Sequence, residues 1–173
     1  AYLPIIEKPN LFNPEIGYIS TANQNITPGD YNKWEAIGFD WADPYRGNRI
    51  NRVLESKEKF NLNEMLALQV DYYSIPSEQI INLSYGLIPN NNEYFSMLEK
   101  WDKKLSKSSI EAGIYIEWQN QLFLELNKKF IPEKVDKYID MQLFKVIEKI
   151  KELTKTNNIK TILEKKHQLN VTN

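Results

Sequence analysis

Residues 108–130 read SSIEAGIYIEWQNQLFLELNKKF, and this stretch carries the clearest structural signal in the sequence. Large apolar side chains recur along it at four-residue steps, the spacing of neighbours on one face of an amphipathic helix. They are Ile110, Ile114, Trp118, Leu122, Leu126 and Phe130. The pattern predicts one long helix from about Ser108 to Phe130, which sets a mainly α fold class.

Segments on both sides repeat this helical pattern. Before the long helix, a packed face is indicated by Tyr94, Phe95, Leu98 and Trp101. After Pro132, a second apolar stripe is formed by Val135, Ile139, Leu143, Ile147 and Ile150. Further upstream, Asn61 stands three residues before Glu64, a pairing typical of a capping box at a helix start. Ser77 is predicted to cap another segment.

Residues 1–43 have a different texture, with four prolines and no helical periodicity. They predict an extended, turn-rich segment with one β-strand over residues 16–22. Asp43-Pro44 then predicts the N-cap and first residue of a helix. We therefore expect a short extended or β segment over residues 1–43, followed by an all-helical domain over residues 44–173.

Composition bounds the function only loosely. The chain has 173 residues, 42% apolar, with a net charge of −1. Mixed charges without a basic patch argue against a nucleic-acid partner, and no apolar run is long enough for a transmembrane segment. The absence of cysteine excludes disulfides, thiolate metal sites and cysteine nucleophiles.

The common catalytic motifs are missing from this sequence. It contains no phosphate-binding glycine loop, no G-x-S-x-G elbow and no H-E-x-x-H zinc motif. The single histidine, His167, stands beside Lys165 and Lys166 near the C-terminus, where a solvated side chain is the simpler interpretation.

Two polar features remain as candidates. Asn23 follows the predicted strand in the segment GYISTANQNITPGDY (17–31), and a rigidly held Asn amide can donate to an oxyanion. Asparagine at a strand end is also a common turn former. Arg46, Arg49 and Arg52 form an arginine row that could clamp carboxylates or line a solvated helix face with surface ion pairs.

Several short motifs, taken in order, resemble the penicillin acylase (penicillin amidase) family of N-terminal-nucleophile (Ntn) hydrolases. The resemblance covers roughly residues 9–75 and continues weakly through Leu98, Trp101-Asp102 and Trp118. Its motifs are Asn13-Pro14, Gly17-Tyr18-Ile19, Thr21-Ala22-Asn23, Tyr45-Arg46, Arg49-Ile50 and Met65-Leu66-Ala67-Leu68-Gln69-Val70-Asp71.

This resemblance implies an amidohydrolase made as an autoprocessed precursor. Its N-terminal serine attacks an acyl amide of the β-lactam or N-acyl-homoserine-lactone type, and the free α-amino group serves as the base. The extended segment would join an αββα core sheet. By the same resemblance, Asn23 belongs to the oxyanion hole and Arg46 orders the active site. No cofactor is implied for catalysis.

The resemblance also implies a possible structural calcium with Glu35 as one ligand, although the local motif has Glu for Asp and one inserted residue. A periplasmic or secreted location is possible on the same grounds. Because residue 1 is Ala, we expect an interior fragment that lacks the nucleophile and is inactive alone. Its partners would be the rest of its own precursor or other processed chains. The alternative is a non-enzymatic helical binding module, in which Asn23 and Arg46 merely cap and pair.

Overall fold

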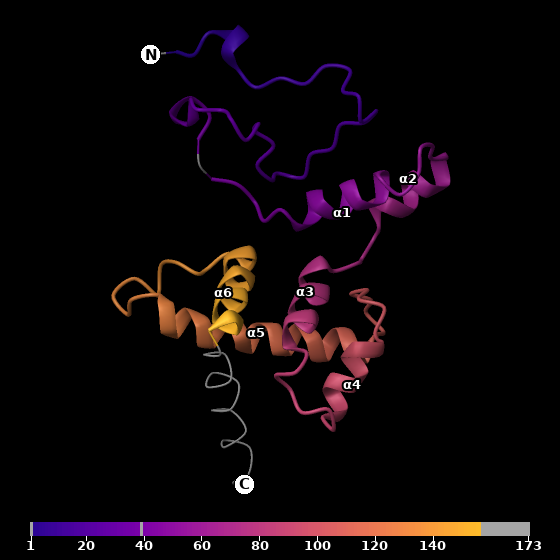
Figure 1. The fold of residues 1–173 in the computed structure, drawn as a ribbon, viewed down its shortest axis with the longest axis vertical. Coiled ribbons are helices and arrows are strands. Elements are labelled where there is room, and N and C mark those ends of the chain that lie inside the picture. The colour runs from indigo at the N-terminus through magenta and orange to yellow at the C-terminus, as the bar shows by residue number, and fades with distance from the viewer. Residues whose placement is uncertain (1, 39, 157–173) are drawn as a thin grey trace. The chain divides into compact units, whose positions relative to one another are not determined.

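The computed structural model describes residues 2–38 and 40–156. Within them the chain forms six α-helices and two short 3₁₀ helices, η1 and η2 (Figure 1). Their bounds, in chain order, are η1 Ile5–Glu7, η2 Trp34–Ala36, α1 Tyr45–Leu54, α2 Leu62–Gln69, α3 Ile75–Ser84, α4 Glu93–Lys100, α5 Ile110–Phe130 and α6 Leu143–Lys155. The predicted mainly α fold is confirmed.

The chain divides into two compact units, Ala1–Val70 and Asp71–Asn173. Helices α1 and α2 belong to the first unit, and α3 to α6 to the second. The domains predicted over 1–43 and 44–173 stay a prediction. None of the described helices is both long and apolar enough to cross a membrane.

The strand predicted over residues 16–22 is not confirmed. No strand is formed in the described residues, which contain only an isolated antiparallel bridge between Tyr73 and Lys104. A strand requires a second backbone to accept and donate its hydrogen bonds. In this unit the side chains of the extended segment bond to helix α1 instead, through Tyr18 and Ser20.

The helix starts agree with the sequence in part. Asn61 begins α2 through the predicted capping box: its Oδ1 accepts from Glu64 N (3.0 Å), and Glu64 Oε2 accepts from Asn61 N (2.9 Å). Helix α1 begins one residue later than predicted, with Pro44 in the N-cap position and its carbonyl accepting from Asn48 N at 2.8 Å. The predicted cap at Asp43 was therefore wrong by one residue.

The predicted cap of α3 was also wrong, because Ser74 and not Ser77 begins this helix. Ser77 N donates to Ser74 Oγ (3.2 Å), and Ser77 Oγ donates back to Ser74 O (2.8 Å). Pro76 thus lies inside the first turn, where its missing N–H leaves no hydrogen bond unmade. The helix ends at Ser84.

The second unit has its own apolar core. Helix α5 packs against α4 and α6, and α6 packs against α3 (Figure 1). Tyr115 is fully buried at its centre, with its ring 5.7 Å from that of Trp101. The buried apolar residues are Ile75, Ile80, Ile81, Phe95, Leu98, Trp101, Ala112, Tyr115, Leu122, Leu126, Val146, Ile147, Ile150 and Leu153.

The two predicted apolar stripes are buried only in part. On α5, Ile110 is 68% exposed, whereas Leu122 and Leu126 are buried. A strict four-residue step advances about 40° per step around an α-helix, so a long stripe turns away from the core. Val135 lies in a turn and Ile139 directly follows it; both precede α6 and are exposed, so the second stripe becomes helical only from Leu143 onward.

The first unit, by contrast, has no closed core in its described residues. Gly47 is the only described residue before Asp71 that is buried. Many large apolar side chains of this unit are exposed instead. They are Tyr2, Ile5, Ile6, Leu11, Phe12, Ile16, Ile19, Ile26, Leu62, Met65, Leu66 and Val70. Burial of apolar surface within the described residues therefore contributes little to ordering this unit.

The first prediction concerns the apolar core of the second unit. Ile147 is fully buried and Ile139 is 53% exposed, although both lie on the same predicted stripe. We expect Ile147→Ala to lower the free energy of unfolding by about 2–5 kcal/mol. Ile139→Ala, the matched control, should change it by no more than about 0.5 kcal/mol. Urea unfolding of the chain followed by circular dichroism measures both, and equal losses would contradict this core.

The second prediction concerns Glu64. The hydrogen bond from Lys57, and next that from Asn61 N, hold the pKa of this carboxyl below its usual value. The pair should therefore stabilise the fold above the unfolded-state pKa and lose that effect as pH falls through the folded-state pKa. We expect Lys57→Met to raise the Glu64 midpoint in a carboxyl ¹³C NMR titration.

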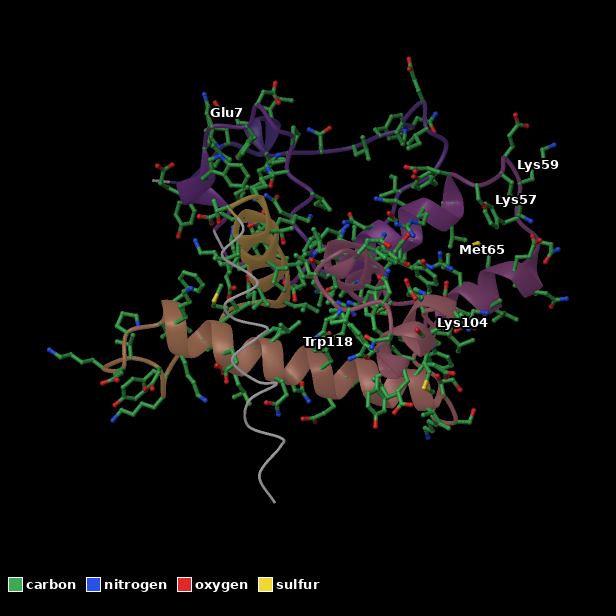
Figure 2. All side chains as sticks on the ribbon, turned by 60° about the horizontal axis from the view of Figure 1, so that its bottom comes forward. Glu7, Lys57, Lys59, Met65, Lys104 and Trp118 are labelled. Atoms are coloured by element: carbon green, nitrogen blue, oxygen red, sulfur yellow. The ribbon has the colours of Figure 1, made fainter. Side chains whose placement is uncertain are left out.

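Lys59 provides the matched control for this titration. Both lysines lie on the loop between α1 and α2 (Figure 2). Lys59→Met removes one positive charge from the same loop but leaves Lys57, the hydrogen-bond partner of Glu64, in place. The Glu64 midpoint should therefore stay unchanged. If both variants shift it equally, general loop charge and not the Lys57 hydrogen bond sets the pKa.

Candidate functional site

Asn23 lies in a tight bend of the first unit. Its backbone is in the left-handed region, with φ at 63°, a conformation that Asn adopts more readily than most residues. Its carbonyl oxygen accepts a hydrogen bond from Ala42 N at 2.9 Å. The bend is therefore tied to the chain just before helix α1.

The segment that leads to Asn23 runs antiparallel to α1 in a regular register. Tyr18 OH donates to Glu55 Oε1 at 3.1 Å, Ser20 Oγ donates to Asn51 Oδ1, and the Ala22 carbonyl accepts from Arg46. Each step of two extended residues spans about 6.6 Å, and the matching steps of four and then five residues along the helix rise about 6.0 and 7.5 Å. Alternate residues of the segment can therefore meet successive turns of the helix.

The Tyr18 hydroxyl is a stable donor in this register. Partial burial, followed by the hydrogen bond and negative charge of Glu55, raises the pKa of the Tyr18 phenol. A phenol is protonated at neutral pH even at its ordinary pKa, and the raised pKa extends to higher pH the range in which Tyr18 can donate to Glu55 at the end of α1.

Arg46 holds the side chain of Asn23. Its Nη2 donates to Asn23 Oδ1 at 2.6 Å and to the Ala22 carbonyl at 3.0 Å. A guanidinium has only donors, so the atom that faces it must be the amide oxygen. The Nδ2 group lies on the other arm of the amide, away from the oxygen that Arg46 contacts. Both residues are exposed in this chain.

The arrangement can present a neutral N–H donor of fixed orientation. The side-chain oxygen is fixed by a charged donor, which makes shorter and stronger hydrogen bonds than a neutral one. The main chain is fixed by Ala42. Arg46 is the member of the arginine row that contacts Asn23, and Arg49 and Arg52 lie further along α1.

Glu35 lies in the first turn of η2 and is exposed. Calcium takes six to eight oxygen ligands, several of them carboxylates. No group of three or more His, Cys, Asp or Glu side chains that could hold a metal exists among the described residues. The described residues therefore do not by themselves fit a calcium site at Glu35, and that assignment stays a prediction. His167 lies outside the described residues.

Two further residues belong to this site and were not predicted from the sequence, Gln24 and Gly47. Gln24 Oε1 accepts from Ala22 N at 2.6 Å, and Gly47 is buried in α1 against the Gln24 side chain. A glycine within the first turns of a predicted helix is the available signal, because it lowers helix stability unless a close approach requires it.

Comparison with known proteins shows the family of the chain. A family model described as penicillin amidase matches residues 1–172, which is nearly the whole chain. No curated protein gives a significant match. The family is one of hydrolases, and the residues that carried the resemblance lie within the matched region. The chain therefore belongs to the penicillin amidase family.

Proposed function

We propose that the full-length protein is an amidohydrolase that cleaves a linear acyl amide, with Asn23 as an oxyanion-hole donor. The observation that supports this proposal most directly is the hydrogen bond from Arg46 Nη2 to Asn23 Oδ1, at 2.6 Å. This contact leaves the Nδ2 arm as the one available for a ligand. Membership in the penicillin amidase family supports the reaction class.

Asn23 would act on the oxygen of the scissile carbonyl. When a nucleophile adds to the carbonyl carbon, this oxygen gains negative charge, and an N–H donor already in place stabilises it without reorganisation. The nucleophile is an N-terminal serine supplied by a part of the protein outside these residues, with its α-amino group as the base.

Arg46 would contribute in two ways, as a positioning residue. It fixes the orientation of the Asn23 amide through Oδ1, and its positive charge polarises that amide. Hydrogen bonds in a chain polarise one another, so the Nδ2–H group becomes a better donor. The same Nη2 also holds the Ala22 carbonyl, which couples the side chain of Asn23 to the backbone before it.

The exposed apolar side chains of the first unit support the inference that this unit binds another part of the same protein. Phe12 is 89% exposed and Ile6 is 87% exposed, although both side chains are wholly apolar. The first unit exposes twelve large apolar side chains, and an exposed apolar surface of this kind is typical of a protein interaction site where the side chains are contiguous. Other segments of the precursor, or other processed chains, are the partners we assign to this surface.

The third prediction tests Asn23 in the complete, processed protein. Asn23→Gly removes the amide and accepts the left-handed backbone, so we expect kcat to fall roughly 10²- to 10³-fold with little change in KM. Asn23→Ala should lose the same activity and about 1 kcal/mol more stability, because Ala is strained at φ 63°. Hydrolysis of a panel of chromogenic acyl-anilides measures kcat.

Asn13 provides the matched control, since it is a second asparagine with positive φ, at 48°. Asn13→Gly should leave kcat unchanged. If Asn23→Gly affects only stability, the oxyanion role is wrong. A complete protein that hydrolyses no acyl-anilide would favour the helical binding module.

The fourth prediction tests Arg46. A hydrogen bond to a charged group contributes about 1.5–3 kcal/mol, so Arg46→Ala should lower kcat about 10- to 100-fold. If Arg46 acts through Asn23, the same substitution should cost little in an Asn23→Gly background. Additive losses in the double variant would show that Arg46 acts on its own.

A further inference from the structure

Backbone geometry does not explain why residue 47 is a glycine. Gly47 lies in α1, and its φ is not in the left-handed region where glycine is preferred. An alanine at this position would favour the helix more strongly. The reason for glycine must therefore lie in what approaches it.

The group that approaches Gly47 is the side chain of Gln24. A Cβ atom on Gly47 would lie 2.7 Å from Gln24 Oε1 and nearer still to Cδ and Nε2, all closer than non-bonded atoms allow. Gly47 is also the one buried residue in the described part of the first unit. The Gln24 amide therefore lies directly against the α1 backbone, and a Cβ at residue 47 would have to displace this flexible side-chain end.

Gln24 uses this position to hold the bend before it. Its Oε1 accepts from Ala22 N at 2.6 Å, so the side chain folds back across Asn23. The Ala22 carbonyl is bonded to Arg46 and the Asn23 carbonyl to Ala42 N. The Gln24 contact therefore holds the backbone N–H of Ala22. The next residue is Asn23, which has the left-handed backbone and bears the proposed donor amide.

We propose that Gln24 and Gly47 act as a pair of positioning residues for Asn23, with Gly47 admitting the Gln24 amide that locks the Ala22–Asn23 bend. This inference rests on the proposed function, because it assigns the pair to the same oxyanion donor. Neither residue needs to contact substrate. Their effect should appear in kcat and in the order of the bend, and hardly in KM.

The test is a double-mutant cycle in the complete, processed protein. We expect Gly47→Ala to displace the Gln24 amide and lower kcat about tenfold with KM nearly unchanged. Gln24→Ala should have a similar effect. In the Gln24→Ala background there is no side chain to displace, so Gly47→Ala should cost no further activity and should raise Tm, as alanine does in a helix.

Gly113 in α5 provides the matched glycine. A Cβ on it would meet nothing within 4 Å, so Gly113→Ala should raise Tm and leave kcat unchanged. Hydrogen-exchange mass spectrometry gives a second measure, because Gly47→Ala should speed exchange over residues 18–25, whereas Gly113→Ala should not.

The outcomes separate the two proposals. If Asn23→Gly lowers kcat but Gly47→Ala changes neither kcat nor exchange over residues 18–25, the positioning pair is wrong and the oxyanion role stands. If Asn23→Gly leaves kcat unchanged, the oxyanion role fails, and with it the catalytic part of this inference. Equal losses from Gly47→Ala with and without Gln24 would also overturn the pairing.

Discussion

The hydrogen bond between the Arg46 guanidinium and Asn23 Oδ1 joins the two parts of the first unit on which the proposed oxyanion donor depends. One part is an irregular bend, and the other is a regular helix. A helix residue fixes its side chain relative to a rigid backbone, whereas a bend residue alone does not. The contact therefore fixes the orientation of the Asn23 side-chain amide relative to α1. Without it, this amide would rotate freely in solvent.

Polar contacts alone do not order this unit. Each hydrogen bond contributes about 0.5–1.5 kcal/mol, while fixing the backbone of one residue costs about 1–2 kcal/mol. The bonds from Tyr18, Ser20 and Arg46 to or from α1 can select a register, but they cannot offset the entropy of an extended segment with exposed Phe12 and Ile16. The second unit differs, because its helices bury their apolar faces against one another.

Much of the helical architecture could be predicted from local sequence. The capping box at Asn61 and the long helix through Trp118 depend on residues close in the chain, so their signals are visible without a structure. Errors arose where local signals compete. Ser74 and Ser77 can each begin a helix near Pro76, and only the observed hydrogen bonds show that Ser74 does.

The site was predictable to a smaller degree. Asn23 and Arg46 were singled out by a family resemblance, and nothing in their spacing places them together, because they are joined by tertiary contact. The pairing of Gln24 with Gly47 is of the same kind: a missing side chain on a helix accommodates an amide from a distant bend. Such complementarity has no periodic signal in the sequence.

The central claim is that Asn23 Nδ2 faces the reacting oxygen while Oδ1 stays on Arg46. A crystal structure of the complete, processed protein with a tetrahedral phosphonate bound at its nucleophile tests this directly. The account predicts a phosphonate oxygen about 2.7–3.1 Å from Asn23 Nδ2, with the Arg46 bond retained. An oxygen beyond hydrogen-bond distance from Asn23, or an Asn23 amide released from Arg46, would contradict it.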